Sequence, residues 1–215
     1  MDYYTAEVER VTIDLGDLQL RVDDSVARMI RVRKIRHVSI GIEDGRRITP
    51  LQQRKAYATL RDIGEYTGYP LEAIKQIMKV EHMMRTGDYE YFSLSDCSMT
   101  KAREFINTLL EYALKEGIIL GESGLMRTDD IDAYLIQCIR YRRCCICGQP
   151  ADIHHVEAIG MGQDRRHYDD WYNEVAALCR THHSIAHTIG WRRFMDRYKV
   201  YGIKRYRCQE GDEEQ

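Results

Sequence analysis

The chain has 215 residues, enough for one large domain or two small ones with a sizeable core. Apolar residues make up 44% and charged residues 31%, as in soluble globular proteins, and the net charge of −2 gives no electrostatic argument for a nucleic-acid partner. The charged start and the lack of any apolar run near about 18 residues argue against a signal peptide and a membrane span, so we expect a cytoplasmic protein without membrane contact.

The first part of the chain is predicted to form a small sheet followed by helices. Alternating apolar and polar residues, as in VTIDLGDLQLRV and HVSIGIED, indicate strands between about Val11 and Glu43. Thr49 and Pro50 have the pattern of an N-cap and a first helical residue, so a helix is expected from Pro50 to about Tyr66. Further helices are expected over residues 71–84, 99–117 and 128–143.

Basic residues are frequent in the C-terminal third, and acidic residues gather at its very end. A basic region of this kind is compatible with phosphate binding, although many solvated surfaces have the same composition. Arg165 and Arg166, in the stretch GQDRRHYDD, are predicted phosphate contacts, although a basic pair is usually only solvated surface.

The cysteines indicate metal binding. Four of the seven lie between Cys144 and Cys179, and a cytosolic chain rarely uses a disulfide framework. Cys144 and Cys147 are spaced as C-x-x-C, and Cys179 and His182 have the same two-residue gap. Two such pairs can chelate one zinc ion tetrahedrally. We therefore predict a closed structural zinc site from Cys144, Cys147, Cys179 and His182, named here the cysteine cluster.

Further histidines fit a second, open metal site. His183 and His187 are four residues apart, so on a helix they project from one face, and His154 can complete a set of three. These three are named here the histidine cluster. His155 would point away from His154 on a strand, and a neutral imidazole beside a metal can act as general base on water. Asn173 lies between the cysteine pairs and can orient the base or a loop through its amide.

The order C-x-x-C, His-His, Asn, C-x-x-H-His and a later His resembles the HNH nucleases. The resemblance implies a ββα-metal fold that hydrolyses DNA phosphodiesters with a divalent metal held by the histidine cluster. That metal would be Mg²⁺ or Mn²⁺, with Zn²⁺ and Ni²⁺ as alternatives. His155 would activate the attacking water, and Asn173 would be the middle asparagine of the motif. In the zinc-stapled subgroup a cysteine is commoner where this chain has His182, and zinc accepts imidazole equally well.

Two narrower resemblances concern bacteriophage proteins. HHVEAIGMGQDRR, LCRTHHSIAHTIG and FMDRYKVYGIK are similar to HNH nucleases of phage recombination modules. Residues 51–54 (LQQR) and 98–101 (SMTK), with the lysine-bearing helix between them, resemble recombination mediators of the NinB (Orf) type. This resemblance implies binding to single-stranded or branched DNA, single-strand-binding protein as a partner, and a homodimer.

The resulting expectation is an α+β protein with a mixed DNA-binding domain and a small zinc-stapled ββα-metal (His-Me finger) nuclease domain. The expected boundaries are 1–122 for the first domain, 123–143 for a linker and connecting helix, 144–207 for the nuclease and 208–215 for an acidic tail.

Two alternatives to the nuclease fit parts of the sequence. The first is a non-catalytic mediator that binds single-stranded DNA and whose zinc module only holds its shape. The second is a zinc deaminase, because His155-Val-Glu157 has the H-x-E pattern of that class. Deaminases need Pro-Cys-x-x-Cys downstream, whereas here Leu178 precedes Cys179 and a histidine takes the second position. The deaminase hypothesis is therefore disfavoured.

Overall fold

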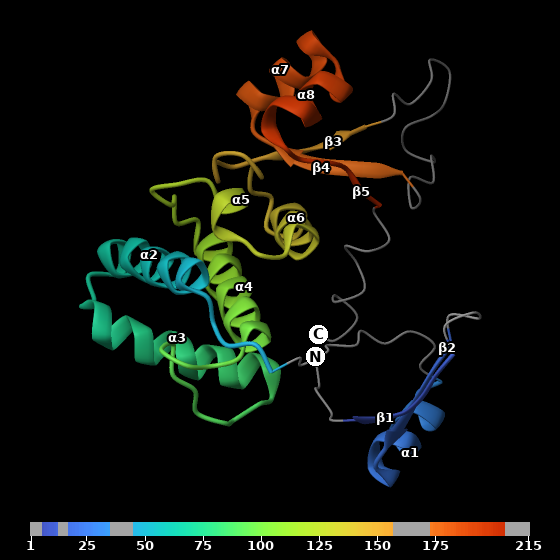
Figure 1. Cartoon of the computed structure of the whole chain (residues 1–215). Helices are drawn as coiled ribbons and strands as arrows, with labels where there is room; N and C mark the ends of the chain where they lie inside the picture. Colours follow the sequence, from blue (N-terminus) through green and yellow to red (C-terminus); the bar gives the residue numbers. More distant parts are fainter. Residues whose placement is uncertain (1–5, 13–16, 35–44, 157–172, 205–215) are drawn as a thin grey trace.

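The computed structural model describes residues 6–12, 17–34, 45–156 and 173–204, and its α+β architecture confirms the predicted fold class. Figure 1 shows the arrangement of its helices and small antiparallel sheets. The elements are β1 (Ala6–Thr12), β2 (Asp17–Val22), α1 (Asp24–Val32), α2 (Pro50–Thr67), α3 (Leu71–Thr86), α4 (Met99–Glu116), α5 (Gly124–Arg127), α6 (Ile131–Arg140), β3 (Asp152–His155), β4 (Glu174–Leu178), α7 (Arg180–Ile189), α8 (Trp191–Tyr198) and β5 (Ile203–Lys204).

The strands predicted between residues 11 and 43 are only partly correct. β1 and β2 pair antiparallel, but the chain then turns into the helix α1. Asp23 caps this helix, because its carboxylate accepts hydrogen bonds from the backbone N–H groups of Ser25 (2.8 Å) and Val26 (3.0 Å). The local capping signal therefore outweighs the alternation that favoured strands. The second predicted stretch, residues 37–44, lies outside the described residues.

The long helices α2, α3 and α4 form close to the predicted positions. Thr49 caps α2 in a capping box: its hydroxyl accepts from the N–H of Gln52 (3.1 Å), and the Gln52 side chain accepts from the N–H of Thr49 (3.0 Å). Ser98 caps α4 by accepting from the N–H of Lys101 (3.1 Å). Each helix ends at a glycine with a left-handed backbone, at Gly68, Gly87 and Gly117.

α6 connects the helical part of the chain to the C-terminal sheet. It packs against α4 and also against β4, and the predicted linker region contains both α5 and α6. Tyr134, Leu135 and Cys138 of α6 are buried in one hydrophobic cluster that extends from α2 to β5. The predicted domain boundaries stay a prediction. α6 contributes to the core through its contacts with α4 and with β4.

The C-terminal part forms a ββα unit with one additional helix and strand. β3 and β4 pair antiparallel with His154 opposite Ala176, and β4 also pairs with β5. α7 follows β4 directly, and Figure 1 shows α7 and α8 together beside this sheet. No helix in the described part of the chain is long and apolar enough to cross a membrane.

A buried histidine lies in the core between α3 and α4. His82 is fully buried, and its ring meets the edges of Phe92 (5.5 Å between centroids) and Phe105 (5.6 Å). Its Nδ1 lies 2.8 Å from the Thr108 hydroxyl. Burial, together with the positive charge of Lys101, lowers the pKa of His82 to about 4. His82 is therefore a neutral core residue at pH 7.

The low pKa of His82 makes stability depend on pH. Between its ordinary value near 6.5 and its folded value near 4, the unfolded chain binds the proton more readily, so the free energy of unfolding falls as pH falls. Acidification from pH 7 to 5 should remove about 2 kcal/mol through this residue. His82→Leu should lose less stability over that interval, because it lacks the titrating imidazole. The Thr108 hydroxyl keeps a partner in this variant, since it donates to the Glu104 carbonyl (3.1 Å).

Urea unfolding of both zinc-loaded proteins at pH 7 and pH 5 tests this prediction. Because acid weakens zinc binding in both proteins, the informative quantity is the difference between them. An equal loss of stability in wild type and His82→Leu would contradict the account of His82.

Candidate metal centres

The cysteine cluster is assembled from a tight turn and the start of α7. The turn after α6 carries Cys144 and Cys147, and it is closed by hydrogen bonds from Gly148 N–H to the Cys144 carbonyl (2.8 Å) and from Cys144 N–H to the Gln149 carbonyl (2.8 Å). Gly148 has φ 71°, a left-handed conformation that favours glycine. Cys179 is the N-cap of α7, which brings the second pair onto the first helical turn.

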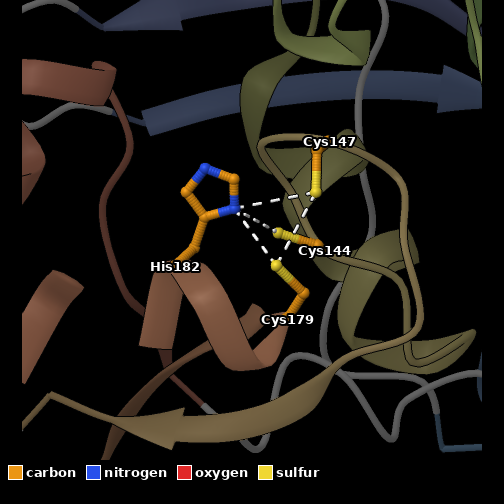
Figure 2. A group of neighbouring side chains, drawn as sticks. All are labelled: Cys144, Cys147, Cys179 and His182. Atoms are coloured by element: carbon orange, nitrogen blue, oxygen red, sulfur yellow. Dashed lines mark hydrogen bonds between the residues drawn. The ribbon is translucent and has the colours of Figure 1, made fainter. Parts of the chain in front are cut away.

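The four side chains of the cysteine cluster converge on one point, as Figure 2 shows. Sγ of Cys147 lies 3.7 Å from Sγ of Cys179. The Nδ1 atom of His182 lies 3.5, 3.6 and 3.2 Å from the sulfurs of Cys144, Cys147 and Cys179. A zinc tetrahedron with bonds of about 2.3 Å to sulfur and about 2.0 Å to nitrogen has edges of about 3.8 Å (S···S) and about 3.5 Å (S···N). The arrangement therefore fits one tetrahedral zinc ion.

Two of the three thiols of this cluster ionise less readily than a free thiol. Burial raises the pKa of Cys144, and it raises the pKa of Cys147 to about 12. Burial acts in the same direction on Cys179, but hydrogen bonds that include one from the backbone N–H of His182 outweigh it and lower the pKa. A bound divalent ion supplies the charge that stabilises all three thiolates. The donor set is that of a structural zinc site.

The histidine cluster lies between β3 and α7. Its three ligand atoms lie within 4.8 Å of one another. Nε2 of His183 faces Nε2 of His187 at 3.2 Å, one helical turn apart. The ring of His154 meets His183 edge-on at 4.8 Å and His187 at 5.1 Å between centroids. His154 is 4% exposed whereas His187 is exposed, so one side of the cluster opens to solvent.

The state of His154 fits metal ligation. Its Nδ1 is buried and has no hydrogen-bond partner among the described residues. A buried polar atom without a partner costs free energy, and a bound metal ion could supply the missing interaction. Burial, followed by the charges of His183 and His187, lowers the pKa of His154 to about 4. The pKa of His183 is lowered as well, mainly by burial. Imidazoles must be neutral to bind a metal, and these two are neutral at pH 7.

His155 and Asn173 lie at the same end of the β3–β4 pair. Strand geometry alone turns His155 away from His154, yet the charge of His155 contributes to lowering the pKa of His183, so it acts on the same site. Val156 N–H donates to the Glu174 carbonyl (3.0 Å), which places Asn173 next to this end. Base and orienting roles for these residues stay predictions. The predicted DNA contacts Arg165 and Arg166 lie outside the described residues.

Two residues near the histidine cluster were not predicted. Asp152 precedes His154 by two positions on β3, and its charge acts to raise the pKa of His183. The period of two along a strand could have indicated it. Trp191, the first residue of α8, has its ring centroid 5.1 Å from that of His154 at a tilt of 32°. Its contact depends on how α8 folds back, which the local sequence does not specify.

The ligand set assigned to the cysteine cluster can be tested by single cysteine substitutions. Cys147→Ser should release the zinc and lower the melting temperature by roughly 10 °C or more, because zinc binding is part of the folding free energy. Cys145→Ala is the matched control: Cys145 is adjacent and fully buried but lies outside the cluster. Metal analysis of the purified chains and thermal unfolding measure both effects. Full zinc content in Cys147→Ser, or zinc loss in Cys145→Ala, would contradict the assigned ligand set.

The sequence model of a family described as "Putative HNHc nuclease" matches residues 18–207, which is most of the chain. The matched range includes both clusters. Searches of curated proteins and of solved structures gave no match.

Proposed function

The chain belongs to the HNHc nuclease family, and from this premise we propose that it is a metal-dependent DNA endonuclease with its active site at the histidine cluster. The observation that carries the proposal is the pairing of a closed Cys₃His set with an open set of three histidines in one ββα unit. A purely structural module needs only the first set. The second set leaves a solvent-facing side at His187, where a phosphate and a water can enter.

His154, His183 and His187 would hold the metal of this site. When bound, a divalent metal stabilises negative charge on the phosphate and on the departing 3′-oxygen. We propose Mg²⁺ or Mn²⁺, as in the family resemblance. An all-imidazole donor set also suits Zn²⁺ and Ni²⁺, so these ions belong in any assay.

His155 is the proposed general base. It is half-buried, it follows a metal-binding position directly on β3, and it acts electrostatically on the same site as His183. A neutral imidazole in this position can take the proton of the attacking water. Asn173, at the same end of the strand pair, is proposed to orient His155 or the backbone beside it.

We propose that the basic face of α8 contacts the DNA backbone. Arg192, Arg193 and Arg197 are exposed on this helix, with Asp196 as the one acidic residue. The same helix places Trp191 against His154, so the basic face begins beside the histidine cluster. Phosphate contacts from such a face would hold the strand near the metal without reading its sequence.

The proposed substrate is branched or single-strand-containing DNA of phage recombination. The resemblance of residues 51–54 and 98–101 to recombination mediators supports it. Tyr66 (63% exposed) and Tyr69 (54% exposed), around the turn between α2 and α3, offer rings on which unpaired bases can stack. The alternative is a mediator that binds single-stranded DNA by this surface and does not cut it. Single-strand-binding protein and a homodimer are further predictions from the same resemblance.

The cleavage proposal predicts distinct effects of two histidine substitutions. Zinc-loaded wild type should cut plasmid, single-stranded or branched DNA with Mg²⁺, Mn²⁺, Zn²⁺ or Ni²⁺. His155→Ala should lower the rate by about 100-fold or more with both metals still bound. His187→Ala should lose the second metal and cleavage together, whereas the core variant His82→Leu should cut normally. Absence of cutting by wild type with every substrate and metal, while DNA is bound, would favour the mediator.

The α8 proposal predicts a change in the salt dependence of DNA binding. In the His155→Ala background, which prevents cutting, Arg193→Gln should reduce the slope of log K against log[salt] by about 0.9 for duplex DNA. The loss of affinity should be similar for unrelated sequences. Arg103→Gln, an exposed arginine of α4, is the matched control and should leave the slope unchanged. An unchanged slope in Arg193→Gln would contradict the contact.

A further inference from the structure

An aromatic stripe on α8 joins the two clusters. Trp191, Phe194 and Tyr198 occur at helical spacing, so their rings lie on one face of the helix. Their ring centroids are separated by 5.5 Å (Trp191 to Phe194) and 4.6 Å (Phe194 to Tyr198). At one end Trp191 meets His154 of the histidine cluster at 5.1 Å. At the other end Tyr198 meets His182 of the cysteine cluster at 5.3 Å, nearly perpendicular.

The stripe is held in place by burial and by the corner that precedes it. Phe194, its middle ring, is fully buried, while the arginines of the other helix face are exposed. Gly190 forms the corner between α7 and α8 with φ 81° and ψ 149°, a conformation almost restricted to glycine. This corner turns α8 back so that its first residue reaches β3. The five rings from His154 to His182 therefore form one continuous packed row.

We propose that the aromatic stripe of α8 is a positioning device that fixes the orientation of His154 relative to the zinc-bound cysteine cluster. The Trp191 ring lies against the His154 ring at a tilt of 32°, and Phe194 and Tyr198 connect Trp191 to the cysteine cluster. His154 is the member of the histidine cluster that comes from β3, whereas the other two share α7. Its orientation is therefore the one that α7 alone cannot set. This inference rests on the metal-binding role proposed for the histidine cluster.

If the stripe positions His154, substitution of its rings should weaken metal binding at the histidine cluster, even where the substituted ring does not contact that cluster. Substitution of groups that orient a metal ligand typically weakens metal binding by about 10-fold to 100-fold. Trp191→Leu, which removes the flat ring, should weaken Ni²⁺ binding at the histidine cluster by about 10-fold or more, and Trp191→Phe should restore most of the affinity. Phe194→Leu should also weaken Ni²⁺ binding, although the ring contacts of Phe194 are with Trp191 and Tyr198.

Calorimetric titration of the zinc-loaded full chain with Ni²⁺ tests the proposal without DNA. Zinc content is measured for every variant, so that only chains with an intact cysteine cluster are compared. Ile203→Val is the matched control, because it trims a buried side chain of β5 in the same unit without touching the stripe. Wild-type Ni²⁺ affinity in Trp191→Leu or Phe194→Leu would overturn the proposal. So would an equal loss in Ile203→Val.

A second measurement needs neither nickel nor cleavage. In the zinc-loaded chain without a second metal, the Trp191 ring should shift the imidazole C–H resonances of His154 in the NMR spectrum. Trp191→Leu should abolish this shift and Phe194→Leu should reduce it, whereas unchanged shifts would overturn the proposal. A chain that binds Ni²⁺ and shows these effects but cuts no DNA would contradict the nuclease function and support the stripe.

Discussion

Two neighbouring histidines on the first turns of α7 point into different clusters, and the geometry of the C-terminal unit depends on this division. Successive residues on a helix are rotated by about 100°, so His182 and His183 cannot serve one site. His182 meets the three sulfurs of the cysteine cluster, and His183 meets His154 and His187. A zinc ion that fixes His182 therefore also fixes the rotation of α7 about its own axis.

The helices of the C-terminal unit bury too few apolar side chains to fix the rotation of α7 by packing alone. α7 buries only Ala186 fully among its residues, and α8 only Phe194. Strands β3 and β4 have four and five residues. Units of this size usually depend on a metal or a disulfide for stability. A zinc ion at the cysteine cluster would supply such a cross-link, and contacts of β4 with α6 join the unit to the larger helical core.

Local sequence was sufficient to predict which cysteines and histidines lie together in the two candidate metal sites. The two-residue gaps of the cysteine pairs match one turn of chain around a zinc ion, and the four-residue step from His183 to His187 matches one helical turn. The structure brings together these same residues. Helices α2 and α4 were also predictable, because Thr49 and Ser98 are strong capping signals and Gly117 ends the second of them.

Features that depend on tertiary contacts were not predictable. The helix α1 is a different case: it lies between the two alternating stretches and was not predicted, although its cap at Asp23 is a local signal. The spacing of Trp191, Phe194 and Tyr198 is visible in the sequence, but their partners His154 and His182 are fixed only when the Gly190 corner turns α8 back. Spacing predicts which residues share a face, and only the fold decides what that face meets.

Two separate metal sites of different chemistry should fill in two distinguishable steps, and stepwise substitution with cobalt can separate these steps. Titration of the metal-free chain with Co²⁺, followed by absorption spectroscopy, distinguishes thiolate from imidazole ligands. The first equivalent should give thiolate charge-transfer bands and intense tetrahedral bands. The second should add only weak bands without thiolate character, and His187→Ala should remove this second step alone. Binding of a single equivalent, or thiolate bands that keep growing with the second, would contradict the account.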